Sequence, residues 1–280
     1  MLRRPFLFAP FICGLSSVIN NAIFIIMQRR QPAAPAGSLQ AEETDMSIAE
    51  NIAAIRSKMD TAAISAGRDP KEILLCAATK MNDAQAVRQA IAGGVDCCGE
   101  NRVQELNEKL SQDAYRGKPV HFIGHLQTNK VKNVVGKVSL IHSVDSLRLL
   151  EAVNREALKQ GICQDILLEV NIAGEDSKSG FAPGELFPVL EKAGSFPGVR
   201  IRGLMAIPPI CQNKTENHKF FQEMYNLSVD ITAKKYDNVW VDVLSMGMSG
   251  DYEDAISCGA TMIRIGTAIF GARNYTQSKL

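Results

Sequence analysis

Lys80 is the residue of this sequence that is best placed for covalent chemistry. It lies two residues beyond the apolar run Ile73–Ala78, which has the length of a buried strand. Partial desolvation at the end of such a strand lowers the pKa of an ammonium group. The resulting amine can form a Schiff base with an aldehyde. A loop lysine that extends its ammonium into solvent is the alternative, and the position of Lys80 alone favours that alternative.

Two further tracts are suited to binding an anion. Ser245–Asp251 (SMGMSGD) and Arg264–Thr267 (RIGT) combine small, hydroxyl-bearing and glycine residues, and each leads into a predicted helix. Backbone N–H groups at helix starts, together with Ser and Thr hydroxyls, form cradles for phosphate groups. Ordinary turn and helix-cap chemistry accounts for the same residue types equally well.

The elements that must position these residues alternate along the chain. Eight apolar runs are predicted strands: Ile73–Ala78, Val95–Gly99, His121–Gly124, Leu140–Val144, Ile166–Ile172, Ile201–Ile207, Val239–Ser245 and Thr261–Gly266. Helical patterns precede or separate them over residues 47–66, 83–92, 146–160, 183–193 and 215–234. We therefore predict an α/β fold, a single (β/α)₈ TIM barrel with an extra N-terminal helix that covers its bottom or side. A miscount by one strand would leave an open doubly wound sheet as the alternative.

In such barrels the residues that follow the strands build the site. The candidates in chain order are Lys80, Glu100, Asn101, His125, Gln127, Ser143, Asp145, Asn171, Met205, Ser245–Ser249, Arg264 and Gly266. Phosphate sites in barrels frequently occupy the loops after the seventh and eighth strands, where the two anion-binding tracts lie. An amine across the barrel from a phosphate cradle suits pyridoxal 5′-phosphate, whose aldehyde and phosphate lie on opposite sides of its ring.

The composition is that of an ordinary globular protein. The 280 residues are 46% hydrophobic and 22% charged, with a net charge of +1. This balance argues against a nucleic-acid-binding surface or a polybasic membrane patch. Seven cysteines without a C-x-x-C pair favour a reducing, cytoplasmic location over a disulfide framework.

The first 45 residues differ in character from the rest. Residues 5–27 carry no charge and are long enough to span a bilayer, whereas residues 31–45 have the composition of a linker. Pro10 and the Asn20-Asn21 pair disfavour a membrane anchor. We expect a mis-assigned start or a disordered extension over residues 1–45, followed by one soluble domain over residues 46–280. A targeting or anchor segment is the alternative.

Other chemistries have weaker support. No metal site is expected, because His121 and His125 lack the glutamate of a zinc-protease motif and His142 and His218 have no evident partners. No Walker A sequence and no G-x-G-x-x-G after a strand indicates nucleotide binding.

Reactive thiols and a second lysine are also weaker candidates. Cys76, Cys163 and Cys258 lie in apolar or helical contexts that are typical of buried, inert thiols. Lys178 is a poorer Schiff-base candidate than Lys80 because it lies well beyond its strand. The segment Gln104–Gln112 is interpreted as a solvated helix face.

Several motifs together resemble those of one family. They are Gly99–Asn101 (GEN), Val120–Lys130 (VHFIGHLQTNK), Asp176–Gly180 (DSKSG), Gly203–Pro208 (GLMAIP), Ser245–Ser249 (SMGMS) and Arg264–Gly271 (RIGTAIFG). In this order they are similar to the signature of the YggS-like pyridoxal phosphate homeostasis proteins, also called proline synthase co-transcribed homologues. The resemblance extends from about residue 46 to residue 275.

The resemblance implies an alanine-racemase-like barrel of fold type III that carries pyridoxal 5′-phosphate on Lys80. It implies that Asn101 lies beside the ring and that Arg264 faces the pyridine nitrogen. The other residues that it places at the cofactor, several of them around the phosphate, are Met205, Ser245, Met246, Gly247, Ser249, Gly266 and Thr267. Val120 and Thr79–Met81 depart from the family pattern, without removing the lysine.

The function implied is cofactor binding without established catalysis. The family is associated with balanced intracellular pools of pyridoxal phosphate and of amino and keto acids. An arginine at the ring nitrogen keeps its own proton, which leaves the ring a weak electron sink. We therefore expect no catalytic residues, and a monomeric carrier or homeostasis protein that supplies apo-enzymes. A pyridoxal-phosphate enzyme, either a racemase or a lyase, is the alternative.

Overall fold

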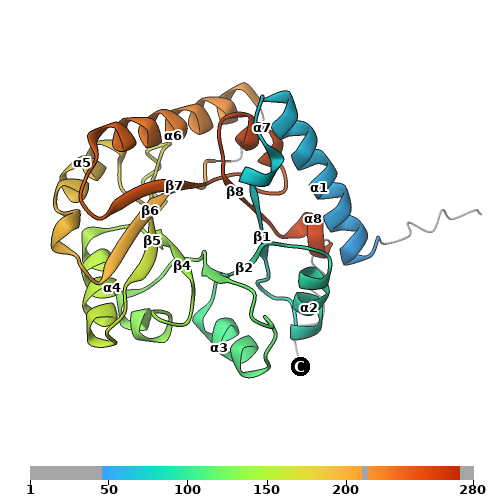
Figure 1. The fold of residues 1–280 in the computed structure, drawn as a ribbon, viewed down its shortest axis with the longest axis horizontal. Coiled ribbons are helices and arrows are strands. Elements are labelled where there is room, and N and C mark those ends of the chain that lie inside the picture. The colour runs from blue at the N-terminus through green and yellow to red at the C-terminus, as the bar shows by residue number, and fades with distance from the viewer. Residues whose placement is uncertain (1–45, 210–213, 272–280) are drawn as a thin grey trace, which may run out of the picture. The chain divides into compact units, whose positions relative to one another are not determined.

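Eight parallel strands close into a barrel in the part of the chain that the structure describes (Figure 1). This computed structural model describes residues 46–209 and 214–271. The strands are β1 (Leu74–Ala78), β2 (Cys97–Glu100), β3 (Val120–Phe122), β4 (Leu140–Val144), β5 (Gln164–Glu169), β6 (Val199–Met205), β7 (Val239–Ser245) and β8 (Met262–Ile265). Each strand pairs with the next along the chain, and β8 pairs with β1. The predicted TIM barrel is confirmed.

The helices lie on the outside of this ring, where they cover the apolar outer face of the strands (Figure 1). They are α1 (Ile48–Ser65), α2 (Ala84–Ala92), α3 (Val103–Ser111), α4 (Leu147–Lys159), α5 (Pro183–Glu191), α6 (Lys214–Lys234), α7 (Tyr252–Ser257) and α8 (Thr267–Phe270). Three short 3-10 helices join them: η1 (Pro70–Glu72), η2 (Thr128–Asn133) and η3 (Ala193–Ser195). The helix after β3 is replaced by η2.

The extra helix predicted before the first strand is α1. Ser47 caps it and forms a capping box with Glu50, and its buried face carries Ile52, Ile55 and Met59. The helix contacts α2, α7 and α8 beside the seam where β1 pairs with β8 (Figure 1). It therefore covers the side of the barrel.

The fifth strand is shorter at its carboxyl end than the sequence predicted. It ends at Glu169, and Asn171 lies beyond it in a turn. The amide group of Asn171 donates hydrogen bonds to the carbonyl oxygens of Glu175 and Lys178, which bends the chain away from the sheet. Asn171 thus shapes a loop, and Glu169 takes its place at the end of the strand.

The segment Gln104–Gln112, interpreted from its sequence as a solvated helix face, forms most of helix α3, and one face of this helix is buried. Val103, Leu106 and Lys109 form that face. Lys109 is only 4% exposed, because its ammonium pairs with the buried carboxylate of Glu100. One charged residue of this segment, Lys109, therefore belongs to a buried ion pair with β2, and the interpretation as a purely solvated face was wrong.

The described helices include none that is both long and apolar enough to cross a membrane. The predictions about residues 1–45 concern a segment outside the described residues. The domain boundary near residue 46 stays a prediction.

The inside of the barrel is filled by side chains from alternate strand positions. Two small apolar clusters contain strand residues alone, and both touch Val243: one comprises Cys76, Cys97 and Met262, the other Leu140, Leu167 and Met205. Towards the carboxyl ends of the strands the buried side chains become polar, with His142, Ser245 and Arg264 among them. This polar layer is where a barrel site is expected.

Candidate functional site

The predicted cofactor-binding residues lie on five neighbouring strands at the carboxyl end of the barrel. Met205 ends β6 and pairs with Ser245 at the end of β7. Arg264 lies in β8 and Gly266 follows that strand. A Cβ placed on Gly266 would lie 3.5 Å from the Cβ of Ala78, which ends β1. The end of β1 is joined in turn to β2, because the backbone N–H of Thr79 donates to the carbonyl oxygen of Gly99 at 2.9 Å.

Arg264 is held rigidly inside this layer. Its Nη1 donates to the hydroxyl of Ser245 at 2.6 Å, and its Nη2 donates to the carbonyl oxygen of Ala206 at 2.9 Å. Burial lowers the pKa of its guanidinium, and the nearby Glu169 opposes this effect. A guanidinium remains protonated at physiological pH. The site therefore contains a fixed positive charge that can donate hydrogen bonds but cannot transfer a proton.

A pair of buried histidines continues the hydrogen-bond chain from Ser245 into the barrel. Nδ1 of His142 lies 3.0 Å from the Ser245 hydroxyl, and Nε2 of His142 lies 3.0 Å from Nδ1 of His121. Burial lowers the pKa of both imidazoles, that of His121 to about 4. The expectation that His142 has no partner was wrong. The signal was the two-residue period of strands, since His142 lies two positions after the inward-facing Leu140.

The loop after β7 is tied to the start of α8. Gly247 has φ +91°, a conformation that favours glycine, and a Cβ there would lie 2.6 Å from the Cβ of Ala255. The hydroxyl of Ser249 accepts a hydrogen bond from the backbone N–H of Ala268 at 3.3 Å. The predicted helices after both tracts are confirmed as α7 and α8. Met246 is fully buried, whereas Thr267 at the start of α8 is exposed.

Lys80 lies two residues beyond β1 and is partly buried. The residue before it, Thr79, is held by two buried hydrogen bonds. Its carbonyl oxygen accepts from the ammonium of Lys109 at 2.7 Å, and its hydroxyl donates to the carboxylate of Glu100. The hydroxyl of Tyr115 donates to the same carboxylate at 3.1 Å. This buried network, which sequence reasoning missed, determines where the backbone of Lys80 lies.

Asn101 is placed by a close approach of two loops. A Cβ on Gly124 would lie 2.3 Å from the carbonyl oxygen of Asn101, so only glycine allows this contact. The side-chain Oδ1 of Asn101 is buried and has no hydrogen-bond partner among the described residues. A buried amide oxygen without a donor is costly. It is therefore suited to receive a hydrogen bond from a ligand.

Glu169 is a buried carboxyl group that sequence reasoning also missed. It lies two positions after the inward-facing Leu167 and is 9% exposed. Burial, assisted by the charge of Asp145, raises its pKa to about 7, although Arg264 and His125 act in the opposite direction. A carboxyl group with this pKa can hold or release a proton near neutral pH.

The weaker candidates have structural explanations. The ammonium of Lys178 pairs with the carboxylate of Glu175 at 2.7 Å. Cys163 is exposed, so its assignment to a buried context was wrong. Cys258 is buried as expected, but its Sγ lies 3.3 Å from Nδ1 of His218, a partner that the sequence did not indicate.

Comparison with known proteins places this geometry in a family. The family model of the alanine racemase N-terminal domain matches residues 47–274. The pyridoxal phosphate homeostasis protein of Aquifex aeolicus is 40% identical over 230 residues, which cover 82% of this chain and all of that protein. The chain belongs to the pyridoxal phosphate homeostasis protein family.

Solved structures share the barrel fold of this chain. The structure of PipY from Synechococcus elongatus with pyridoxal phosphate bound superposes with a TM-score of 0.70 at 33% identity, and covers 80% of this chain and 100% of PipY. An alanine racemase of Clostridium difficile superposes with a TM-score of 0.62 at 13% identity, over 81% of this chain and 58% of the racemase. The racemase therefore shares the barrel fold.

Proposed function

We propose that this protein binds pyridoxal 5′-phosphate, with Lys80 as the attachment site, and that it serves in pyridoxal phosphate homeostasis. The observation that carries the proposal is that Lys80, Arg264 and Asn101 lie on or directly after neighbouring strands at the carboxyl end of the barrel. The strands that lead to the amine of Lys80 and the buried guanidinium of Arg264 are paired, and the unpartnered amide oxygen of Asn101 follows the next strand. The names of the relatives and the cofactor bound to PipY support the same ligand.

Each residue then has a defined task. The bound cofactor supplies an aldehyde for covalent attachment and a phosphate for anchoring. Lys80 provides the amine, and the network behind Thr79 fixes its backbone. Arg264 is proposed to face the pyridine nitrogen, held in place by Ser245 and Ala206. Because Arg264 keeps its proton, it leaves the ring nitrogen unprotonated.

The remaining predicted residues form the wall and the phosphate cradle. We propose that Ser249, Gly266 and Thr267 contact the phosphate, because they lie on the loop and helix start joined by the Ser249–Ala268 hydrogen bond. The Ser245 hydroxyl is engaged by Arg264 and His142. Its proposed role is therefore to hold Arg264 where it would face the pyridine nitrogen. The buried Met205, Met246 and Gly247 support this layer.

Borohydride reduction followed by peptide mapping tests the attachment site. The expected result is a pyridoxyl group on the peptide that contains Lys80. The Lys80→Ala variant should purify without yellow colour, whereas Lys178→Ala should stay yellow. An adduct on another lysine, or an equally yellow Lys80→Ala protein, contradicts the assignment.

A carrier without amino-acid turnover is the function that we favour. Transfer of the bound cofactor to an apo-enzyme in a coupled assay is the expected activity. The proposal includes a monomeric, cytoplasmic protein. Light scattering on a size-exclusion column and fractionation of cells that express the full chain measure these two properties.

Glu169 favours a second candidate function, that of an amino-acid racemase or lyase. Its carboxyl group has a pKa of about 7. Glu169 is the last residue of β5 and faces the inside of the barrel, so it is a candidate acid or base. The measurement is isotope exchange at the Cα of L-alanine. Exchange at about 1–10³ s⁻¹ that is lost in Glu169→Gln would establish an enzyme.

A further inference from the structure

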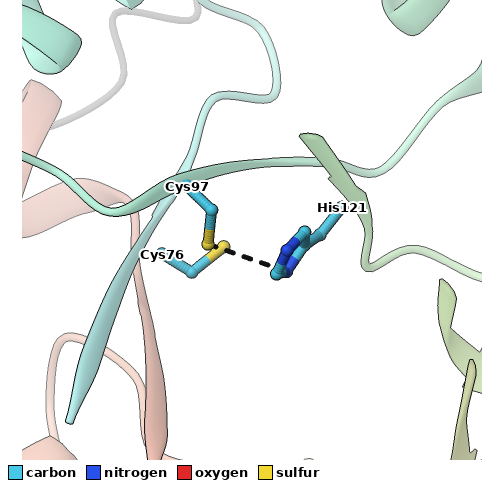
Figure 2. A group of neighbouring side chains, drawn as sticks. All are labelled: Cys76, Cys97 and His121. Atoms are coloured by element: carbon cyan, nitrogen blue, oxygen red, sulfur yellow. Dashed lines mark hydrogen bonds between the residues drawn. The ribbon is translucent and has the colours of Figure 1, made fainter. Parts of the chain in front are cut away.

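Three metal-ligand side chains meet inside the barrel, and one of them, Cys76, pairs in the sheet with Arg264 of the proposed cofactor site. Cys76 on β1 and Cys97 on β2 are direct partners in the sheet, and His121 on β3 faces both of them (Figure 2). The sulfur of Cys97 lies 3.6 Å from Nδ1 of His121. The three ligand atoms all lie within 4.8 Å of one another, and all three residues are buried.

We propose that Cys76, Cys97 and His121 bind a zinc ion, with His142 as the fourth ligand. Zinc takes four ligands at about 2.3 Å to sulfur and 2.0–2.1 Å to nitrogen, so tetrahedral ligand atoms lie roughly 3.3–3.8 Å apart. The Cys97–His121 separation fits this spacing. Nε2 of His142 lies 3.0 Å from the ligating Nδ1 of His121 but outside the group whose atoms lie within 4.8 Å of one another, so it must exchange its contact with His121 for one with the ion.

The chemistry of the surroundings selects a soft, divalent ion. Two sulfurs and two imidazole nitrogens suit zinc, whereas calcium and magnesium need oxygen ligands. The apolar neighbours of the two cysteines inside the barrel are Met262 and Val243. Cys76 also pairs in the sheet with Arg264, whose buried positive charge favours thiolate ligands. As the two Zn–S bonds form, each thiol loses its proton to solvent. Two thiolates then balance the charge of Zn²⁺, and a neutral complex is the form that an apolar interior tolerates.

The site would also connect with the proposed cofactor layer. The other ring nitrogen of His142, Nδ1, lies 3.0 Å from the hydroxyl of Ser245, and that hydroxyl accepts from Arg264. Such outer contacts orient a metal-bound imidazole. A zinc ion would therefore fix the inner end of the hydrogen-bond chain that holds Arg264. The zinc proposal itself does not depend on the cofactor.

Metal analysis of the full-length protein tests the site. The protein is expressed in zinc-supplemented cells, purified without chelators and analysed by mass spectrometry of its elements. We expect about one zinc ion per chain. In Cys97→Ser and in His121→Ala the content should fall to below about a tenth of this value, because a ligand set that has lost one of its members holds zinc poorly. Cys163→Ser, which changes an exposed cysteine, is the matched control and should keep its zinc.

Cobalt substitution provides a second measurement that needs no variant. Protein from cobalt-supplemented cells, freed of pyridoxal phosphate, should show sulfur-to-cobalt charge-transfer absorption and the intense visible bands of a tetrahedral ion. A folded wild-type chain with neither zinc nor these bands overturns the proposal. So does zinc that persists in a folded Cys76→Ala/Cys97→Ala protein, or a disulfide between these two cysteines in the freshly purified chain.

Discussion

The hydroxyl of Ser245 accepts a hydrogen bond from the guanidinium of Arg264 at 2.6 Å, and both side chains are buried inside the barrel. His142 lies 3.0 Å from the same hydroxyl on its other side. One small side chain at the end of β7 thus joins an arginine from β8 to a histidine from β4. The position of Arg264 depends on this contact.

Replacement of Ser245 by alanine should weaken both the fold and the cofactor site. The buried Nη1 of Arg264 would lose its acceptor, which costs about 1–3 kcal/mol of unfolding free energy. Pyridoxal phosphate affinity should fall as well, because Arg264 would no longer be held. Urea unfolding and a cofactor titration measure the two effects. Ser57→Ala, which changes an exposed residue of α1, is the control for stability, with an expected change within about 0.5 kcal/mol. An unchanged urea midpoint for Ser245→Ala would contradict the structural role.

The buried pair of Lys109 and Glu100 should be sensitive to the loss of either partner. Lys109→Met leaves the carboxylate of Glu100 buried without its cation, which we expect to cost about 3–5 kcal/mol. The pair of the exposed Lys159 with Glu156, with a 3.9 Å separation, provides the matched control. Lys159→Met should change stability by less than about 1 kcal/mol. Both values come from urea unfolding of the cofactor-free protein.

A double variant separates the ion pair from simple packing. Glu100→Gln together with Lys109→Met removes both charges, so the double variant should be less destabilised than the sum of the single variants. Strict additivity would show that the two charges do not interact.

Most of the fold could be predicted because the strands of this barrel are nearly continuous apolar runs. The predicted limits of β4 and β7 agree with the structure residue for residue. The predicted end of the fifth strand, Ile172, lies three residues beyond its observed end at Glu169. The apolar run continues to Ile172, whereas the side-chain amide of Asn171 turns the chain before that residue. Apolarity alone does not distinguish a strand from the buried start of a loop.

The polar network of the site could not be predicted in the same way. The contact of Ser245 with Arg264 depends on the register of β7 against β8, in which Ser245 pairs with Met262. The pairing of Lys109 with Glu100 depends on the packing of α3 over β2. A strand-period argument could have identified His142 and Glu169 as inward-facing, but the identity of their neighbours requires the closed barrel.

Glu169 should make the stability of the cofactor-free protein depend on pH. Its pKa is about 7 in the folded protein, compared with an ordinary value of 4.5. Between these values the folded protein retains a proton that the unfolded chain has lost, so the free energy of unfolding falls as the pH rises. The full loss is up to about 3 kcal/mol. Urea unfolding at a series of pH values measures this slope.

The variant Glu169→Gln should remove this slope. It cannot ionise, so above pH 7 it should be more stable than the wild-type protein by up to about 3 kcal/mol. Asp83→Asn, which replaces the exposed cap of α2 by an equally good cap residue, should change stability by less than about 0.5 kcal/mol without altering the slope. If Glu169→Gln keeps the wild-type pH dependence, Glu169 is not the titrating group.

Gly124→Ala should reduce cofactor binding through Asn101 without changing any proposed cofactor-binding residue. The added Cβ would lie 2.3 Å from the carbonyl oxygen and 2.6 Å from the Cα of Asn101, so the loop after β2 must move. We expect at least about a tenfold loss of pyridoxal phosphate affinity, because small displacements of a positioning residue are costly. Gly184→Ala is the control, since a Cβ at this helical position meets no atom within 4 Å. It should bind the cofactor normally and unfold at slightly higher urea concentration. Equal affinities of the two variants, measured by absorbance titration, would show that the position of Asn101 does not matter for the cofactor.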